Sequence, residues 1–232
     1  MRDVIFAATL LLSTAPAFAQ VKETERVDAC RDVLEELLNI PEGIPQNLLD
    51  KAECVAVIPS VKKFALGFGG RFGKGAVVCR TNHGNGPWGP PLMLSIGGGS
   101  FGAQIGGQAA DVVFLVMNPK GIDSLLKSQF TLGADASVAA GPKGRATEAA
   151  TDIAMRADIL SYSRTRGLFA GISLEGAVIK QDKDGNVNLY GERVEPRDLL
   201  LKPGQPIPPA ARGLVEAIQK HSPENLSGDK HL

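Results

Sequence analysis

A stretch of 57 residues, from Cys54 to Ala110, contains no aspartate or glutamate and fourteen glycines. Glycine weakens a helix by about 1 kcal/mol relative to alanine and is suited to turns, bulges and close approaches of the backbone. Short apolar runs (CVAVI, AVVC and LMLSI) alternate in this stretch with clusters of Gly, Pro and Asn, which is typical of strands joined by turns. We therefore expect an α+β protein with a glycine-rich, mainly antiparallel sheet or partly closed barrel packed with a few helices.

The flanking segments carry the expected helices and further strands. Apolar residues recur at helical spacing between Val21 and Leu38, and the face between them is acidic, so this helix is expected to pack on the core. The other expected elements are a buried strand at 111–117, a short helix at 119–128, strands within 159–179, a hairpin turn at Asp184-Gly185 and a helix at 210–220. Asp182, Asp184, Asn186 and Asn188 alternate as in a calcium loop, but the glycine is misplaced for an EF-hand, which favours the turn.

The first residues have the order of a secretory signal peptide. Arg2 precedes an apolar run from Val4 to Leu12, and Ala17-Phe18-Ala19 forms a small-residue cleavage site before Gln20. The predicted organisation is a signal peptide at 1–19, an amphipathic helix at 20–45, one domain at 46–192 and a loosely attached proline-rich tail with a short helix at 193–232. The predicted location is periplasmic or secreted, peripheral on a membrane.

Charge and cysteine content limit the classes of molecule and metal that this protein is expected to bind. The 25 basic residues balance the 25 acidic ones, which argues against a nucleic-acid-binding protein. Three cysteines (Cys30, Cys54 and Cys79) lack the spacing of a zinc site, and no cofactor is expected. In an exported protein they are either buried thiols or one disulfide with one free thiol, and the pair is open.

Two glycine motifs are reminiscent of enzymes. Gly98-Gly99-Ser100-Phe101-Gly102 matches GxSxG, but a nucleophile elbow needs a helix next and an acid and a histidine later in the chain. Gly97, Gly99 and Gly102 spell GxGxxG without a clear βαβ unit. No catalytic or metal site is therefore expected. We expect these glycines to serve the backbone, with at least one of Gly98, Gly99, Gly102, Gly106 and Gly107 at positive φ.

A basic and aromatic segment is the candidate binding site. Phe64, Leu66 and Phe68 alternate, as on one face of a strand, and Phe72 continues the spacing. Either the phenylalanines are core and the charges a solvated rim, or the segment docks on anionic headgroups. The candidate lipid-binding residues are Lys62, Lys63, Phe68, Arg71, Lys74 and Arg80.

Several longer strings resemble a known family. CVAVIPSVKK, GGSFGAQIGGQAADVVFLVMN, LGADASVAAGPKGRA and SYSRTRGLFAGISLEG are similar to the SYLF domain, over about Asn47 to Gly191. The resemblance implies binding of phosphoinositide or other anionic lipid, with actin binding in some fungal members, and no enzymatic activity.

The first hypothesis is therefore an exported, non-catalytic module that binds anionic phospholipid. A signal peptide would send this chain where actin is absent, and no Src-homology-3 module is visible in the sequence, so actin binding is not expected to carry over. The alternative is a structural or protein-interaction module of the cell envelope, and a hydrolase using Ser100 is a distant third. The lipid species and the oligomeric state stay open.

Overall fold

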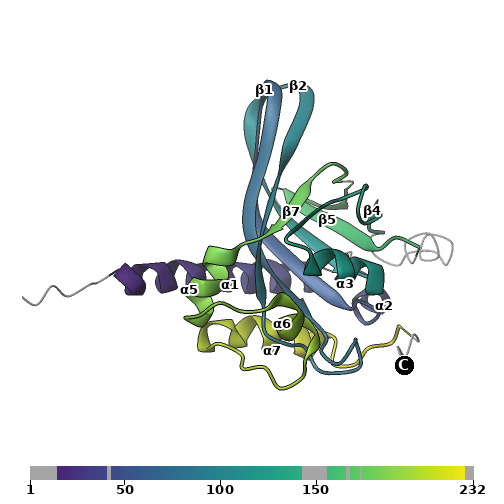
Figure 1. The fold of residues 1–232 in the computed structure, drawn as a ribbon. Coiled ribbons are helices and arrows are strands. Elements are labelled where there is room, and N and C mark those ends of the chain that lie inside the picture. Colours follow the sequence, from purple (N-terminus) through teal and green to yellow (C-terminus); the bar gives the residue numbers. More distant parts are fainter. Residues whose placement is uncertain (1–14, 41–42, 143–155, 166–167, 173, 228–232) are drawn as a thin grey trace, which may run out of the picture.

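The computed structural model describes residues 15–40, 43–142, 156–165, 168–172 and 174–227, with the side chains of 15–19, 65–68, 100–107, 168–169 and 171 left aside. It confirms the α+β class with a mainly antiparallel sheet (Figure 1). The helices are α1 (Ala15–Leu38), α2 (Gln46–Leu49), α3 (Pro119–Leu126), α5 (Lys183–Tyr190), α6 (Pro196–Leu201), the 3-10 turn η1 (Pro209–Ala211) and α7 (Arg212–His221). The strands are β1 (Cys54–Cys79), β2 (Leu92–Val116), β3 (Gln129–Thr131), β4 (Val138–Ala140), β5 (Ile159–Thr165), β6 (Leu168–Gly171) and β7 (Val178–Gln181).

The sheet is built around β2. Its order is β3-β7-β2-β5-β4, with β1 paired to β2 and β6 paired to β5. Among the described strands, β4 and β5 form the parallel pair and the other pairs are antiparallel. The sequence predicted several short strands between Cys54 and Ala110, whereas the structure has two long ones. Glycine allows this because it permits bends within a continuous ladder.

The antiparallel ribbon of β1 and β2 folds back on itself, with its bend at the irregularity between Ala65 and Gly67, so that the two ends of β1 meet. On one side of the bend, the first half of β1 pairs with the second half of β2, from Cys54 opposite Val116 to Ala65 opposite Gly106. The second half of β1 pairs with the first half of β2, from Gly67 opposite Gly102 to Val77 opposite Leu92. The far end of this paired ribbon projects beyond the rest of the molecule (Figure 1). We call residues 62–72 of β1 and 97–109 of β2 the arm.

The two ends of β1 meet at the base of the ribbon. Cys54 and Cys79 form a disulfide with their Cα atoms 4.0 Å apart, and the Arg80 amide donates to the Glu53 carbonyl at 2.8 Å. Cys30 is the buried free cysteine, and burial raises the pKa of its thiol to about 12. One bridge and one free thiol was an option that the sequence left open. Closing a loop of 25 residues stabilises the fold by about 3.5 kcal/mol, because it restricts the unfolded chain.

Helices cover both faces of the sheet, with α1 and α7 packed on one face and α3 and α6 on the other. Helix α1 packs its apolar side (Val27, Cys30, Leu34 and Leu37) against β1, as predicted, and α7 adds Leu214 and Ile218 to the same core. The C-terminal segment is not loosely attached, contrary to expectation, because α6 and α7 bury Leu200, Val215 and Ala217 as well. The apolar residues of these two helices recur at helical spacing and form a face that is buried against the core. This burial holds the segment in place although it is rich in proline.

The predicted hairpin turn at Asp184-Gly185 is wrong, because this segment is the first turn of α5. The Asp182 side chain caps the helix by accepting from the Gly185 amide at 3.2 Å, and Gly191 ends it in the left-handed conformation. Asn186 fixes the helix to the sheet, since its side-chain oxygen accepts from the Met93 amide at 2.8 Å. An N-cap and one tertiary hydrogen bond thus override a local turn signal.

The N-terminal helix begins earlier than expected. The predicted helix from Val21 to Leu38 is confirmed, but α1 starts at Ala15 and continues through the predicted cleavage site after Ala19. Most of the predicted signal peptide, residues 1–14, lies outside the described residues, and the signal peptide stays a prediction. In the described part of the chain, no helix combines the length and apolar character needed to span a membrane.

Candidate functional site

The arm exposes large apolar side chains beside basic ones. Phe64 and Phe72 are 61% and 55% exposed, and Lys62 and Lys63 are exposed next to Phe64. The first of the two alternatives given for the phenylalanines, that they belong to the core, is therefore wrong for Phe64 and Phe72. Phe68 lies opposite Phe101 in the ladder, and its side chain is outside the described residues. Large apolar side chains that a projection exposes to solvent are typical of an interaction surface.

The arm carries no negative charge. Residues 62–72 and 97–109 contain no Asp or Glu, while Lys62, Lys63 and Arg71 contribute three positive charges. Two acids near the base of the arm already form ion pairs. Asp111 Oδ2 lies 2.7 Å from the Arg164 guanidinium, and Asp182 Oδ2 lies 2.7 Å from the ammonium of Lys74, two residues beyond the arm in β1. The arm is a positive surface whose charges are not neutralised from within.

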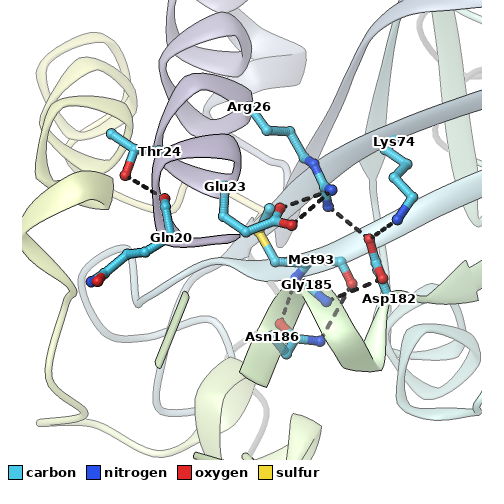
Figure 2. A network of polar contacts seen from close by, with 9 residues as sticks. All are labelled: Gln20, Glu23, Thr24, Arg26, Lys74, Met93, Asp182, Gly185 and Asn186. Carbon is cyan, nitrogen blue, oxygen red and sulfur yellow. Dashed lines mark hydrogen bonds and ion pairs between the residues drawn. The ribbon is translucent and has the colours of Figure 1, made fainter. Parts of the chain in front are cut away.

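Lys74 belongs to a partly buried ion-pair network rather than to the arm. Its ammonium and the Arg26 guanidinium both lie 2.7 Å from the same carboxylate oxygen of Asp182 (Figure 2). Glu23 binds Arg26 from the preceding turn of α1 at 2.8 Å, and the side chains of Arg26 and Asp182 are less than a tenth exposed. The network joins α1, β1 and the start of α5. It places the predicted site residue Lys74 in a structural role.

Asp182 titrates at unusually low pH. Burial raises the pKa of this carboxyl, but hydrogen bonds from Lys74, Arg26 and the Gly185 amide outweigh burial, so that the pKa lies below its ordinary value. Because the folded-state pKa is depressed, the contribution to stability is complete above the unfolded value of about 3.9. It is lost as pH falls through the folded pKa.

We expect Asp182→Asn to lower the free energy of unfolding by about 3 kcal/mol at pH 7, because it leaves the Arg26 charge buried with one partner fewer. Between pH 4 and pH 2 this deficit should shrink, since the native carboxyl is then being protonated. Urea unfolding at pH 7, 4 and 2 measures both effects. Asp123→Asn, at an exposed position of α3, is the control. An equal deficit at all three pH values contradicts the assignment.

Arg80 does not fit the predicted docking surface. It is buried, lies 4.3 Å from the centre of the Trp88 ring, and its guanidinium donates to the Ser222 hydroxyl at 2.7 Å and to the Glu224 carbonyl at 2.9 Å. Trp88 donates to the Ser222 carbonyl at 2.8 Å. The pair holds the end of the C-terminal segment against the base of the ribbon. Arg80 is therefore structural, which corrects its inclusion among the lipid-binding candidates.

Arg71 differs from the other arginines that are not exposed. Arg26, Arg31 and Arg164 form ion pairs, and Arg80 lies in the field of Glu53 and Asp50. Arg71 is half-buried, and its Nε is buried without a hydrogen-bond partner among the described residues. Desolvation alone lowers the pKa of this guanidinium. The sequence ranked Arg71 with the neighbouring lysines and carried no signal that would set it apart.

The enzyme-like motifs are strand segments. Ser100 and the glycines on both sides lie inside β2, so Ser100 is not at the strand-to-helix turn of a nucleophile elbow, and GxGxxG opens no helix. Gly98 has a φ of +154°, which confirms the expected positive φ in this group.

A groove of about 850 Å³ beside α5 is lined by Lys183 and Arg193 together with Asp184 and Glu195. Over the described residues, no group of His, Cys, Asp and Glu is arranged to hold a metal ion.

Comparison with known proteins agrees with this architecture. A family model described as "Ysc84: Las17-binding protein actin regulator" matches residues 97–221, more than half of the chain. This chain belongs to the Ysc84 family, the family of the SYLF domain. The resemblance inferred from the sequence is thereby confirmed, and the description of the family is that of a regulator rather than of an enzyme.

Three relatives of this SYLF-domain chain illustrate the match, two from fungi and one from an animal. The chain is 37% identical over 199 residues to an SH3 domain-containing protein of Schizosaccharomyces pombe, covering 84% of this chain and 45% of the relative. It is 32% identical over 205 residues to Protein YSC84 of Saccharomyces cerevisiae, covering 84% and 43%. Human SH3 domain-containing YSC84-like protein 1 is 32% identical over 176 residues, covering 75% and 50%. The chain spans about half the length of these relatives.

Proposed function

We propose that this SYLF-domain protein is a non-catalytic module that docks on anionic membranes through its arm. One observation carries the proposal: the acid-free arm exposes two phenylalanines, Phe64 and Phe72, and two lysines, Lys62 and Lys63. Basic residues attract the arm to an anionic surface, and aromatic side chains bury their rings among the lipids.

The magnitudes suit reversible binding. Three basic residues contribute about 1 kcal/mol each at an anionic surface. Two phenylalanines that are already partly covered add about 1.5 kcal/mol each, the lower end of the range for burying such a side chain. The sum of about 6 kcal/mol corresponds to a dissociation constant of roughly 40 µM. Electrostatic attraction alone, about 3 kcal/mol, would leave binding weaker than millimolar, so the phenylalanines are essential to the proposal.

Vesicle co-sedimentation tests this function. The protein is expected to sediment with vesicles of phosphatidylcholine and phosphatidylserine and to stay in solution with phosphatidylcholine alone. Binding should weaken steeply between 50 and 500 mM salt, because exposed charges are screened within about 10 Å at 0.1 M. Equal binding to both kinds of vesicle contradicts the electrostatic part. No binding to either, with the fold intact, favours the protein-interaction alternative that the family description suggests.

We also propose that the chain is exported and processed after Ala19. The support is the order of a short charged start, an apolar run and Ala17-Phe18-Ala19. Cleavage there would leave Gln20 at the start of the remaining part of α1, and the buried Glu23 and Arg26 would stay in the mature protein. The expected observation is a mass corresponding to residues 20–232 in the extracytoplasmic fraction. A full-length mass in the cytoplasm contradicts export.

A further inference from the structure

The side chain of Gln20, the residue that follows the proposed cleavage site, is free to react. Gln20 is exposed, and within the described part of the chain its carboxamide forms no hydrogen bond. Figure 2 shows this side chain directed away from the ion pair of Arg26 and Asp182. The backbone of Gln20 is held instead, because the Thr24 hydroxyl donates to its carbonyl oxygen at 3.0 Å. The carboxamide therefore sits on a fixed backbone without a partner of its own.

Cleavage after Ala19 would release an α-amine on the same residue. The first N–H groups of a helix have no intrahelical acceptor, so this amine would start α1 without a backbone partner. The ordinary pKa of an α-amino group, about 7.7–8.0, leaves part of such amines uncharged at neutral pH. The positive end of the helix dipole disfavours the charged form further. The uncharged amine is a nucleophile.

The amine and the carboxamide of Gln20 can meet without a change in the helix. A ring formed between them would contain only N, Cα, Cβ, Cγ and Cδ of this one residue. Closing it therefore requires rotation about side-chain bonds, and the carbonyl oxygen that accepts from Thr24 stays where it is. Ring closure is compatible with the folded protein.

We propose that Gln20 of the exported chain is converted to pyroglutamate; this inference rests on the proposed cleavage after Ala19. The uncharged amine attacks the side-chain Cδ, and a bond forms between N and Cδ. The bond between Cδ and Nε2 breaks, and this nitrogen takes up the proton that the amine loses and leaves as ammonia. The product is an uncharged lactam. No oxidant, reductant or cofactor takes part.

The surroundings of Gln20 favour the lactam over an ammonium group. Gln20 lines a pocket of about 540 Å³ between α5 and the proline-rich residues 206–209. Val187, Leu189, Tyr190 and Ile207 contribute apolar groups to this pocket. A charge beside apolar groups loses hydration, and a positive charge is unfavourable at a helix N-terminus. Cyclisation removes that charge and should therefore stabilise the start of α1.

The intact mass of the protein from the extracytoplasmic fraction tests the modification. The expected mass is that of residues 20–232 with the Cys54–Cys79 disulfide, less one ammonia. Edman degradation should be blocked until pyroglutamyl aminopeptidase removes the first residue and exposes Val21. The control is Gln20→Ala, which keeps a small residue at the cleavage site and has no carboxamide. This variant should carry a free amine and be sequenced directly.

A second measurement does not depend on export. Residues 20–232 are released from a fusion protein by a protease that leaves Gln20 first, and the thermal midpoint is measured at once and after incubation at neutral pH. The midpoint should rise by about 1–3 °C as ammonia is lost, because a charge at the helix N-terminus is removed. The same chain with Gln20→Ala should keep its mass and its midpoint.

The outcomes separate the modification from the export. A protein that is cleaved after Ala19 but keeps its ammonia overturns the modification and leaves export intact. A full-length mass overturns both for the protein in the cell. A released chain that loses ammonia without a rise in its midpoint contradicts the stabilising role of the lactam at the pocket.

Discussion

Replacing four residues of the arm should abolish binding to anionic vesicles. The variant Lys62→Gln, Lys63→Gln, Phe64→Ala, Phe72→Ala removes about 2 kcal/mol of electrostatic attraction and about 3 kcal/mol of apolar burial. Affinity should therefore fall more than a thousandfold. Stability should change little, because all four side chains are exposed. Co-sedimentation with phosphatidylserine vesicles measures the binding, and thermal unfolding measures the stability.

A control variant with two lysines and two apolar residues replaced elsewhere on the surface produces the same change in net charge. Lys120 and Lys220 are exposed lysines, and Val187 and Leu226 are exposed apolar residues outside the arm. Changing the lysines to Gln and the apolar residues to Ala alters the net charge by the same amount and should leave binding within about twofold. If the two variants, each with four substitutions, bind equally, the net charge of the protein rather than the arm attracts it to the vesicle. The arm is then not the docking surface.

Gly75→Ala should disrupt the base of the ribbon. The added Cβ would lie 2.0 Å from the Val57 carbonyl oxygen and 2.7 Å from the Ile58 Cα, and backbone atoms cannot rotate away as a side chain does. Forcing atoms into a packed region costs about 1–3 kcal/mol and occasionally more, and we expect the upper end here. Urea unfolding measures the change, with the Cys54–Cys79 disulfide intact in both proteins.

Gly97→Ala is the matched control for this substitution. Gly97 is also a strand glycine of the ribbon, but a Cβ there meets nothing within 4 Å. Alanine at this position should be neutral or stabilise slightly, because it restricts the unfolded chain. Equal destabilisation by both substitutions would mean that strand propensity, and not the close approach of β1 to itself, sets the requirement for glycine at position 75.

The fold class and most of the elements can be predicted from linear patterns of residues. Helical spacing between Val21 and Leu38 and the apolar run from Asp111 to Met117 are periodic signals, and the structure confirms both. Glycine density with an absence of acids located the arm, since composition reports directly on backbone freedom and charge. The family strings confirmed in the comparison are likewise linear patterns.

Which basic residues face outward depends on contacts between segments that are distant in sequence. Lys74 and Asp182 are 108 positions apart in sequence, and so are not linked by any local pattern, yet they form one ion pair. Arg80 has the composition of a surface residue and is buried by Trp88 and the C-terminal segment. The doubling back of β1 brought Cys54 and Cys79 together and left Arg71 without an acid. Ion pairs and disulfides depend on which segments meet in space. In this chain the bent glycine-rich ribbon brings those segments together, and the pairing of its strands cannot be predicted from short-range periodicity.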